Sequence, residues 1–138
     1  MKHNIQVGMV KEVRTSTFVS EGTHTVGADE LHYLVSAPMI ISMVVDISSK
    51  MLETHLSPGY ITIGTKFELN HEKPTLTGEP VNMKVVVTNV EGNHIFLTFE
   101  GVDSAGKFCK GYMERYVVDT ARLMHAAYER FPTVKNQP

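Results

Sequence analysis

Hydrophobic and polar residues alternate along several segments of the chain, which is the pattern of strands that bury one face. The clearest case is residues 60–71 (YITIGTKFELNH), where one side of the alternation carries Ile61, Ile63, Thr65, Phe67, Leu69 and His71. Strands are also predicted at residues 7–19, 81–90, 94–102 and 106–118. Short turns at 91–93 and 103–106 are typical of hairpins, so the last three strands should form an antiparallel meander.

A helix is predicted from Pro38 to about His55, before the break at residues 57–59, because proline suits the first turn of a helix. Proline also restricts the residue before it, so Ala37 should mark the boundary, with Ser36 just outside. The polar residues of this helix form one narrow stripe: Ser42, Asp46, Ser49 and Glu53. Nearly every other direction is apolar, so we expect protein to surround the helix.

Two further segments complete the prediction. Residues 20–35 are irregular and lead into the helix as a loop. Asp119 or Thr120 can cap a short final helix at 121–130. Together these elements predict an α+β fold, in which a long antiparallel sheet wraps around one apolar helix.

Composition narrows the classes of protein that remain. The chain has 138 residues, of which 42% are hydrophobic and 20% charged, as expected for one ordinary globular domain. A net charge of -2 gives no electrostatic case for nucleic acid or an anionic membrane. The single cysteine, Cys109, excludes an internal disulfide, and the histidines show no metal-ligand spacing. Residues 1–13 lack the apolar core of a signal peptide, and the apolar run at 37–47 is too short to span a bilayer. We therefore expect a cytoplasmic protein.

Several short motifs occur in a characteristic order along this framework. They are Ser36-Ala37-Pro38, Pro58-Gly59, Gly64-Thr65 leading to His71, Gly78, Glu91-Gly92, Gly111, Glu114-Arg115 and Val117-Val118-Asp119. With a sheet curled around a central helix, they resemble the hotdog-fold thioesterase superfamily, and within it the fluoroacetyl-CoA thioesterase-like branch. The resemblance implies a single hotdog domain over residues 1–138, with a core at about 7–125 and a loose tail at 131–138.

The resemblance also implies an activity and an assembly. Members of this branch hydrolyse a thioester with a threonine, a glutamate and a histidine, take an acyl-CoA as substrate, and need no cofactor. They form homodimers whose sheets join edge to edge, and a higher oligomer can be built from such dimers. His71 stands at the position of the histidine. Counted without gaps, the threonine falls on Ala37 and the glutamate on Val45, while Ser36 and Asp46 lie one residue to either side.

Each candidate catalytic residue has a functional and a structural interpretation. His71 suits a general base that activates water or a hydroxyl, or it is a strand-end histidine bonded to a carbonyl. Ser36 suits a nucleophile or a positioning hydroxyl, or it caps the helix. Asp46 suits a displaced partner of His71, or it belongs only to the polar stripe.

Candidate substrate contacts come from the helix start and two strands. Backbone N–H groups near Ala37 and Pro38 could face a thioester oxygen as it gains charge. Gly64 and Thr65 lie within a strand, where a glycine often marks close approach of a ligand. Arg115 could meet a phosphate of CoA, or it could pair with one of three glutamates at positions 12, 72 and 114.

Three functions were weighed against these residues, and two of them remain. The first is hydrolysis of a short or medium acyl-CoA, with His71 activating water or a hydroxyl near the helix start. The second is non-catalytic binding of an acyl-CoA or another small ligand, because the expected threonine and glutamate are missing. Hydration or dehydration of an acyl-CoA is disfavoured, since proteins of the hydratase branch carry an Asp-x-Asn-x-x-His motif on the helix and this chain lacks it. His24 and His32 lie in the loop before the helix and could belong to a lid.

Overall fold

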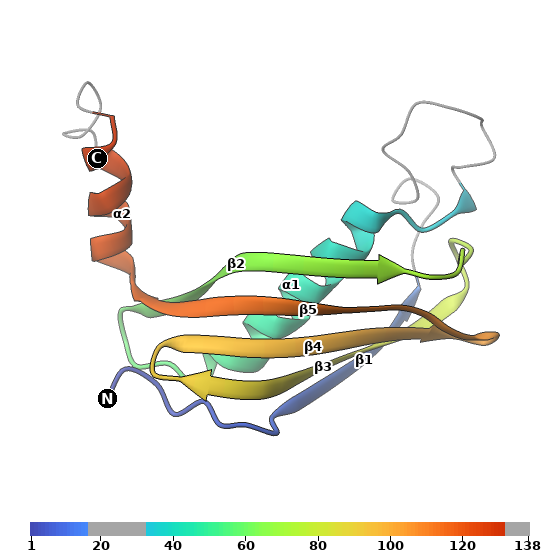
Figure 1. The fold of residues 1–138 in the computed structure, drawn as a ribbon, viewed down its shortest axis with the longest axis horizontal. Coiled ribbons are helices and arrows are strands. Elements are labelled where there is room, and N and C mark those ends of the chain that lie inside the picture. Colours follow the sequence, from blue (N-terminus) through green and yellow to red (C-terminus); the bar gives the residue numbers. More distant parts are fainter. Residues whose placement is uncertain (17–32, 132–138) are drawn as a thin grey trace.

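One antiparallel sheet and one long helix form the body of the protein (Figure 1). The computed structural model describes residues 1–16 and 33–131. In chain order the elements are β1 (Val10–Ser16), α1 (Ala37–Glu53), β2 (Tyr60–His71), β3 (Pro80–Glu91), β4 (His94–Asp103), β5 (Gly106–Asp119) and α2 (Thr120–Glu129). The strand order is β1-β3-β4-β5-β2, with every neighbouring pair antiparallel. This architecture confirms the predicted α+β class.

Most element boundaries agree with the sequence prediction because turn chemistry sets them. The β3–β4 and β4–β5 hairpins close at the pairs Glu91–His94 and Asp103–Gly106, and Gly92 and Gly106 have positive φ angles of 63° and 125°. β1 begins later than predicted, after Gly8, whose φ is 95°. The predicted loop at 20–35 and tail at 131–138 lie outside the described residues, apart from 33–35 and Phe131.

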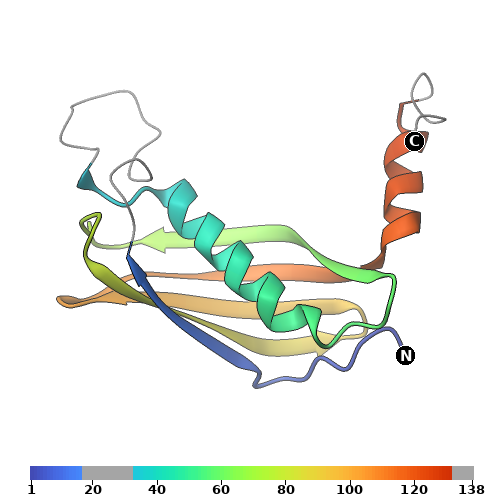
Figure 2. The same ribbon diagram turned by 180° about the vertical axis from the view of Figure 1, so that it is seen from behind.

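α1 packs diagonally across one face of the sheet (Figure 2). Its buried residues meet the inward side chains of the three central strands, which include Val81, Met83, Val85, Val87, Ile95, Leu97, Phe99, Phe108 and Met113. The stripe of Ser42 and Asp46 stays exposed, and Ile41 and Val45 beside it are half-buried. The sheet therefore covers one side of α1, and none of the described residues covers the opposite side, so the expectation that protein surrounds the helix is met on one side only.

A β-bulge in β2 changes which residues share a face with His71. Gly64 pairs with Arg115 while Lys66 pairs with Glu114, so Thr65 is an extra residue on the β2 side. Before the bulge, Thr62 faces α1; after it, Phe67, Leu69 and His71 do. The prediction that Ile61 and Ile63 share the face of His71 is wrong, since the bulge turns them to the outer side of the sheet.

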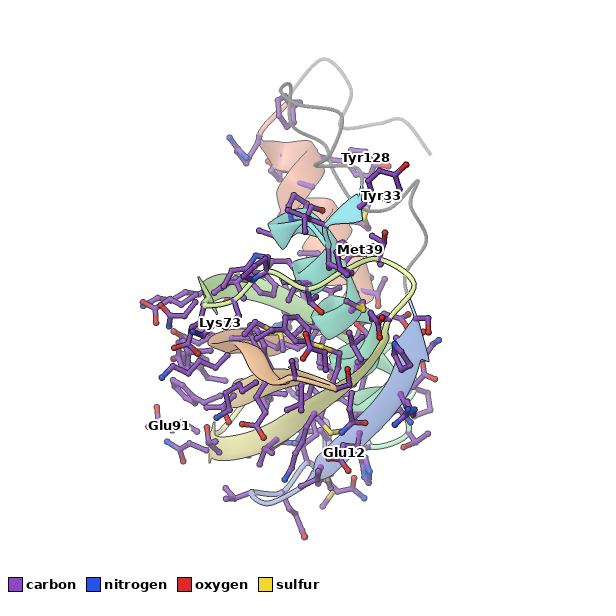
Figure 3. All side chains as sticks on the ribbon, turned by 90° about the vertical axis from the view of Figure 1, so that its right-hand side faces the viewer. Glu12, Tyr33, Met39, Lys73, Glu91 and Tyr128 are labelled. Atoms are coloured by element: carbon purple, nitrogen blue, oxygen red, sulfur yellow. The ribbon has the colours of Figure 1, made fainter. Side chains whose placement is uncertain are left out.

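α2 begins beside the start of β2, which is an edge strand of the sheet. Next to its start, α2 begins at an N-cap formed by Asp119, and the Thr120 N–H donates to the Gly59 carbonyl at 3.0 Å. α2 then leaves the sheet and rises beyond the β2 edge, with no buried residue (Figure 1). Seen from the end, α2 stands above the layer of α1 and not on the outer side of the sheet (Figure 3).

Within the described ranges, no helix is long and apolar enough to cross a membrane.

Candidate active site

An open and largely apolar groove lies between the start of α1 and the end of β2. α1 contributes Ala37, Pro38, Ile41 and Ser42, and β2 contributes Phe67, Leu69 and His71. Its volume is about 660 Å³, which is within the range of small-molecule pockets. A second depression of about 500 Å³ lies on the outer face of the sheet, but neither histidine nor serine lines it. The groove beside His71 is therefore the better candidate for acyl chemistry.

His71 stands at the rim of this groove on a well-fixed strand end. The backbone N–H groups of Glu72 and Lys73 both donate to the Phe108 carbonyl, at 2.9 and 3.1 Å, which holds the chain against β5 just after His71. The imidazole lies edge-on to the Phe108 ring, with centroids 6.4 Å apart. Within residues 1–16 and 33–131, no side chain or backbone group forms a hydrogen bond to the imidazole. Among these residues, nothing occupies either ring nitrogen of His71.

The start of α1 forms the opposite wall of the groove. Ser36 is the N-cap, and its Oγ accepts a hydrogen bond from the Met39 N–H at 3.3 Å. Pro38 has no N–H, and the Ala37 N–H has no partner among the described residues. The segment before the helix is tied to the loop after β2, because the Val35 N–H donates to the Thr75 carbonyl at 3.0 Å. This tether fixes the helix start, with its positive dipole end, against the strand that carries His71.

The structure does not bring every predicted residue into the groove. Asp46 is exposed and forms an ion pair with Lys50 at 3.2 Å, one turn further along α1, so it stands in the polar stripe. Ser36 has its capping role and lies next to the lining residues without being one of them. Thr65 is the extra residue of the bulge, and its hydroxyl donates to the Glu114 carbonyl at 3.4 Å. The predicted His24 and His32 lie outside the described residues.

Arg115 occupies an interior position that neither interpretation of the sequence anticipated. It is 3% exposed and points between α1 and β2 rather than toward a surface glutamate. Its guanidinium donates to the Ser48 and Ser49 hydroxyls at 3.2 and 2.9 Å, and to the side chain and carbonyl of Thr62, both at 3.0 Å. Burial lowers the pKa of Arg115 from its usual value. The cation is therefore stabilised by neutral oxygens, without a carboxylate among these partners.

Gly64 supports the shape of the groove indirectly. It pairs with Arg115 across the bulge, and the ring of Phe67 lies over it. A Cβ at position 64 would stand 2.5 Å from Phe67 Cζ, which is too close for the ring to keep its place. Glycine at this position thus allows Phe67 to line the groove.

Ser42 is the groove residue whose role the sequence did not indicate. The pattern assigned it to the polar stripe with Asp46, but it lines the groove together with His71, while Asp46 does not. It follows Pro38 by four residues, one helical turn, and this spacing could have linked it to the helix start. It supplies a hydroxyl at the wall facing His71.

Cys109 should be unreactive in the folded protein. It pairs with His71 in the sheet register but its side chain is fully buried, and burial raises its pKa to about 12. Only a minute fraction of thiolate is then present at pH 8, and the thiolate is the reactive form. A thiol-specific reagent should label no cysteine in native protein and one per chain in denaturant. Rapid labelling of native protein at pH 8 would contradict this assignment.

A sequence comparison identifies the family of this chain, and structure comparisons show which solved structures share its fold. The sequence model of the fluoroacetyl-CoA-specific thioesterase family matches residues 13–121. The structure is similar to that of a hot-dog-like protein from Thermanaerovibrio acidaminovorans, with a TM-score of 0.84 and 27% identity over 91% of this chain and 92% of that chain.

More distant structures share the same fold. A variant of the fluoroacetyl-CoA-specific thioesterase has a TM-score of 0.82 and 15% identity, over 94% of this chain and 99% of that chain. A Thermus thermophilus hypothetical protein, described as a thioesterase superfamily member, has a TM-score of 0.79 and 21% identity, over 94% of this chain and 95% of that chain. No curated protein sequence matches the chain. Since the family match covers most of the chain, this protein belongs to the fluoroacetyl-CoA-specific thioesterase family and has the hotdog fold.

Proposed function

We propose that this protein hydrolyses the thioester of a short or medium acyl-CoA, with His71 as the general base. The observation that carries the proposal is the position of His71, whose imidazole borders an apolar groove that ends at a helix N-terminus and bonds to none of the described residues. Apolar walls suit an acyl chain, while the imidazole and the helix start provide polar groups at one place. Family membership supports thioester hydrolysis in general.

The geometry suggests how the reaction would proceed. His71 takes a proton from a water molecule as the water oxygen bonds to the thioester carbonyl carbon. The carbonyl oxygen gains negative charge, and the Ala37 N–H and the dipole of α1 stabilise it. The C–S bond then breaks, and protonated His71 returns its proton to the departing CoA sulfur. Ser42 would hold the attacking water, because its hydroxyl lies in the groove.

The size of the acyl group is proposed from the groove and from relatives. One solved structure holds a threonine-to-serine variant of the fluoroacetyl-CoA thioesterase in complex with acetyl-CoA. Another holds a different variant with fluoroacetate and CoA. The groove of the present protein is open and lined by Ile41, Phe67 and Leu69, so it could also accept a longer chain.

A homodimer is part of the same proposal. β2 lies at the edge of the sheet over all of its 12 residues and contains no proline, so its outer edge offers unpaired N–H and C=O groups. A second copy can satisfy these groups by antiparallel pairing of the two β2 strands. The two grooves would then lie close to the seam between the subunits.

Binding without hydrolysis is the second candidate function. Ala37 and Val45 stand where the resemblance places a threonine and a glutamate, and Asp46 pairs with Lys50 instead of reaching the groove. A site with one catalytic group in place of three could retain affinity for an acyl-CoA after losing turnover.

Thiol release from a series of acyl-CoA esters distinguishes the two candidates. Acetyl-, fluoroacetyl-, butyryl-, hexanoyl- and decanoyl-CoA would each be mixed with the protein, and free CoA would be detected with a thiol reagent. We expect turnover of at least one ester above the uncatalysed rate. Binding of the esters in calorimetry, with no release across the series, would reject the hydrolase in favour of the binding protein.

A further inference from the structure

α2 carries an apolar stripe, largely exposed, that none of the residues described by the structure covers. Ala121, Met124, Ala127 and Tyr128 recur at helical spacing, and Phe131 extends the stripe by a further turn. Met124 is 45% exposed and Phe131 is 54% exposed, and no α2 residue is buried. A short helix with such a stripe gains most of its stability from packing, so we expect another apolar surface to pack against α2.

The groove beside His71 has the complementary property. Ile41, Phe67 and Leu69 are only half-buried, because α1 and β2 wall the groove and nothing described in this chain covers it. In an open apolar site, water reaches the reacting thioester, and part of the acyl chain stays in contact with solvent instead of being buried.

α2 cannot cover the groove of its own chain. α2 starts beside Tyr60, which pairs with Asp119, whereas the groove lies at the His71 end of the same strand. A 12-residue strand separates its ends by about 37 Å at roughly 3.4 Å per residue. The 10-residue helix is only about 15 Å long and rises away from the sheet (Figure 1).

A second copy resolves this separation. Antiparallel pairing of two β2 edges about a two-fold axis places the Tyr60 end of one strand beside the His71 end of the other. α2 rises beyond the β2 edge, toward the side that the second copy would occupy (Figure 1). It also stands in the layer of α1, which is the side of the sheet where the groove opens (Figure 3).

We propose that α2 of each subunit covers the acyl groove of the other subunit, with Met124 at the centre of the contact. The inference rests on the dimer included in the proposed function and adds the element that completes each site. Met124 and Tyr128 would then limit the length of acyl chain that the opposite groove accepts.

The apolar area that a stable dimer has to bury favours α2 of the second subunit as the element that covers the groove. A stable dimer usually buries roughly 800 Å² on each partner. Pairing of one strand edge supplies main-chain hydrogen bonds but little side-chain area. The stripe on α2, together with the exposed side of α1 around Ile41 and Val45, offers apolar area that continues directly from that edge.

Cysteine crosslinking tests the placement. The test variant combines Ser42→Cys in the groove with Met124→Cys on the stripe, and the matched control combines Ser42→Cys with Ala126→Cys on the opposite side of α2. Native Cys109 is buried and can remain. We expect a short bismaleimide to join two chains in the test variant, seen as a covalent dimer on a denaturing gel, and several-fold less in the control. Each single-cysteine variant should give only background.

Light scattering and thiol release on the uncrosslinked protein separate this inference from the proposed function. A dimeric mass without crosslinking above the control would overturn the placement of α2 and leave the dimer and the hydrolase standing. A monomeric mass would overturn both the placement and the dimer. Crosslinking without thiol release would support the placement and reject the hydrolase.

Discussion

His71→Ala should lower kcat for acyl-CoA hydrolysis by roughly 10²- to 10⁴-fold, which is the usual contribution of a general base. The variant should remain folded, because His71 is exposed and its described contact is the edge of one aromatic ring, that of Phe108. KM should change little, since the apolar walls that bind the acyl chain stay in place. Steady-state kinetics on the best ester, beside a thermal unfolding curve, would measure both effects.

His55→Ala is the matched control for this experiment. His55 follows the C-terminal end of α1, where its ring bonds to the Asn4 side chain at 2.9 Å, far along the helix from the groove. Its loss should leave kcat within about twofold of the parent. Equal activity in the parent and His71→Ala would exclude His71 as the base.

The predictable part of the fold rests on local signals. Hairpins at Gly92 and Gly106 need positive φ, and Pro38 together with Ser36 fixes the start of α1. These signals act over a few residues, so one sequence suffices to recognise them. They also placed His71 on the inward face with Phe67 and Leu69, and the structure confirms that position.

The bulge in β2 could not be predicted from the alternation alone. An extra residue at Thr65 leaves apolar residues at Ile61 and Ile63 on one face and at Phe67 on the other, and the sequence reads as one continuous pattern. Gly64 was noted as a site of close approach, but its neighbour is the ring of Phe67. A bulge depends on the partner strand, which local patterns do not describe.

Arg115 shows the same limit for long-range contacts. Its hydrogen-bond partners come from α1 and β2, more than 50 residues earlier in the chain. Ser49 was assigned to the polar stripe by helical spacing, and arginine is rarely buried without a carboxylate. Its place in the core emerges only when α1 is packed onto the sheet.

Arg115→Ala should destabilise the protein by roughly 3 kcal/mol or more, because it opens a cavity and leaves buried hydroxyls without their donor. For a chain of this size the Tm should fall by roughly 10 °C. Arg115→Met should cost less, since methionine fills much of the volume and the Ser48 hydroxyl keeps its bond to the Val44 carbonyl at 2.7 Å. Urea unfolding of every variant at one fixed protein concentration measures these differences, because the concentration dependence of dimer dissociation is then the same for all of them.

Arg14→Ala is the control, because Arg14 is exposed on β1 and its loss should change stability by less than about 0.5 kcal/mol. The same variants decide between two roles of Arg115. If the side chain only ties α1 to β2, stability falls in Arg115→Ala and KM per folded molecule stays close to that of the parent. If Arg115→Ala unfolds at the same urea concentration as the parent while KM rises, the guanidinium acts on the substrate, and its bonds to Ser48 and Ser49 give way when the acyl-CoA binds.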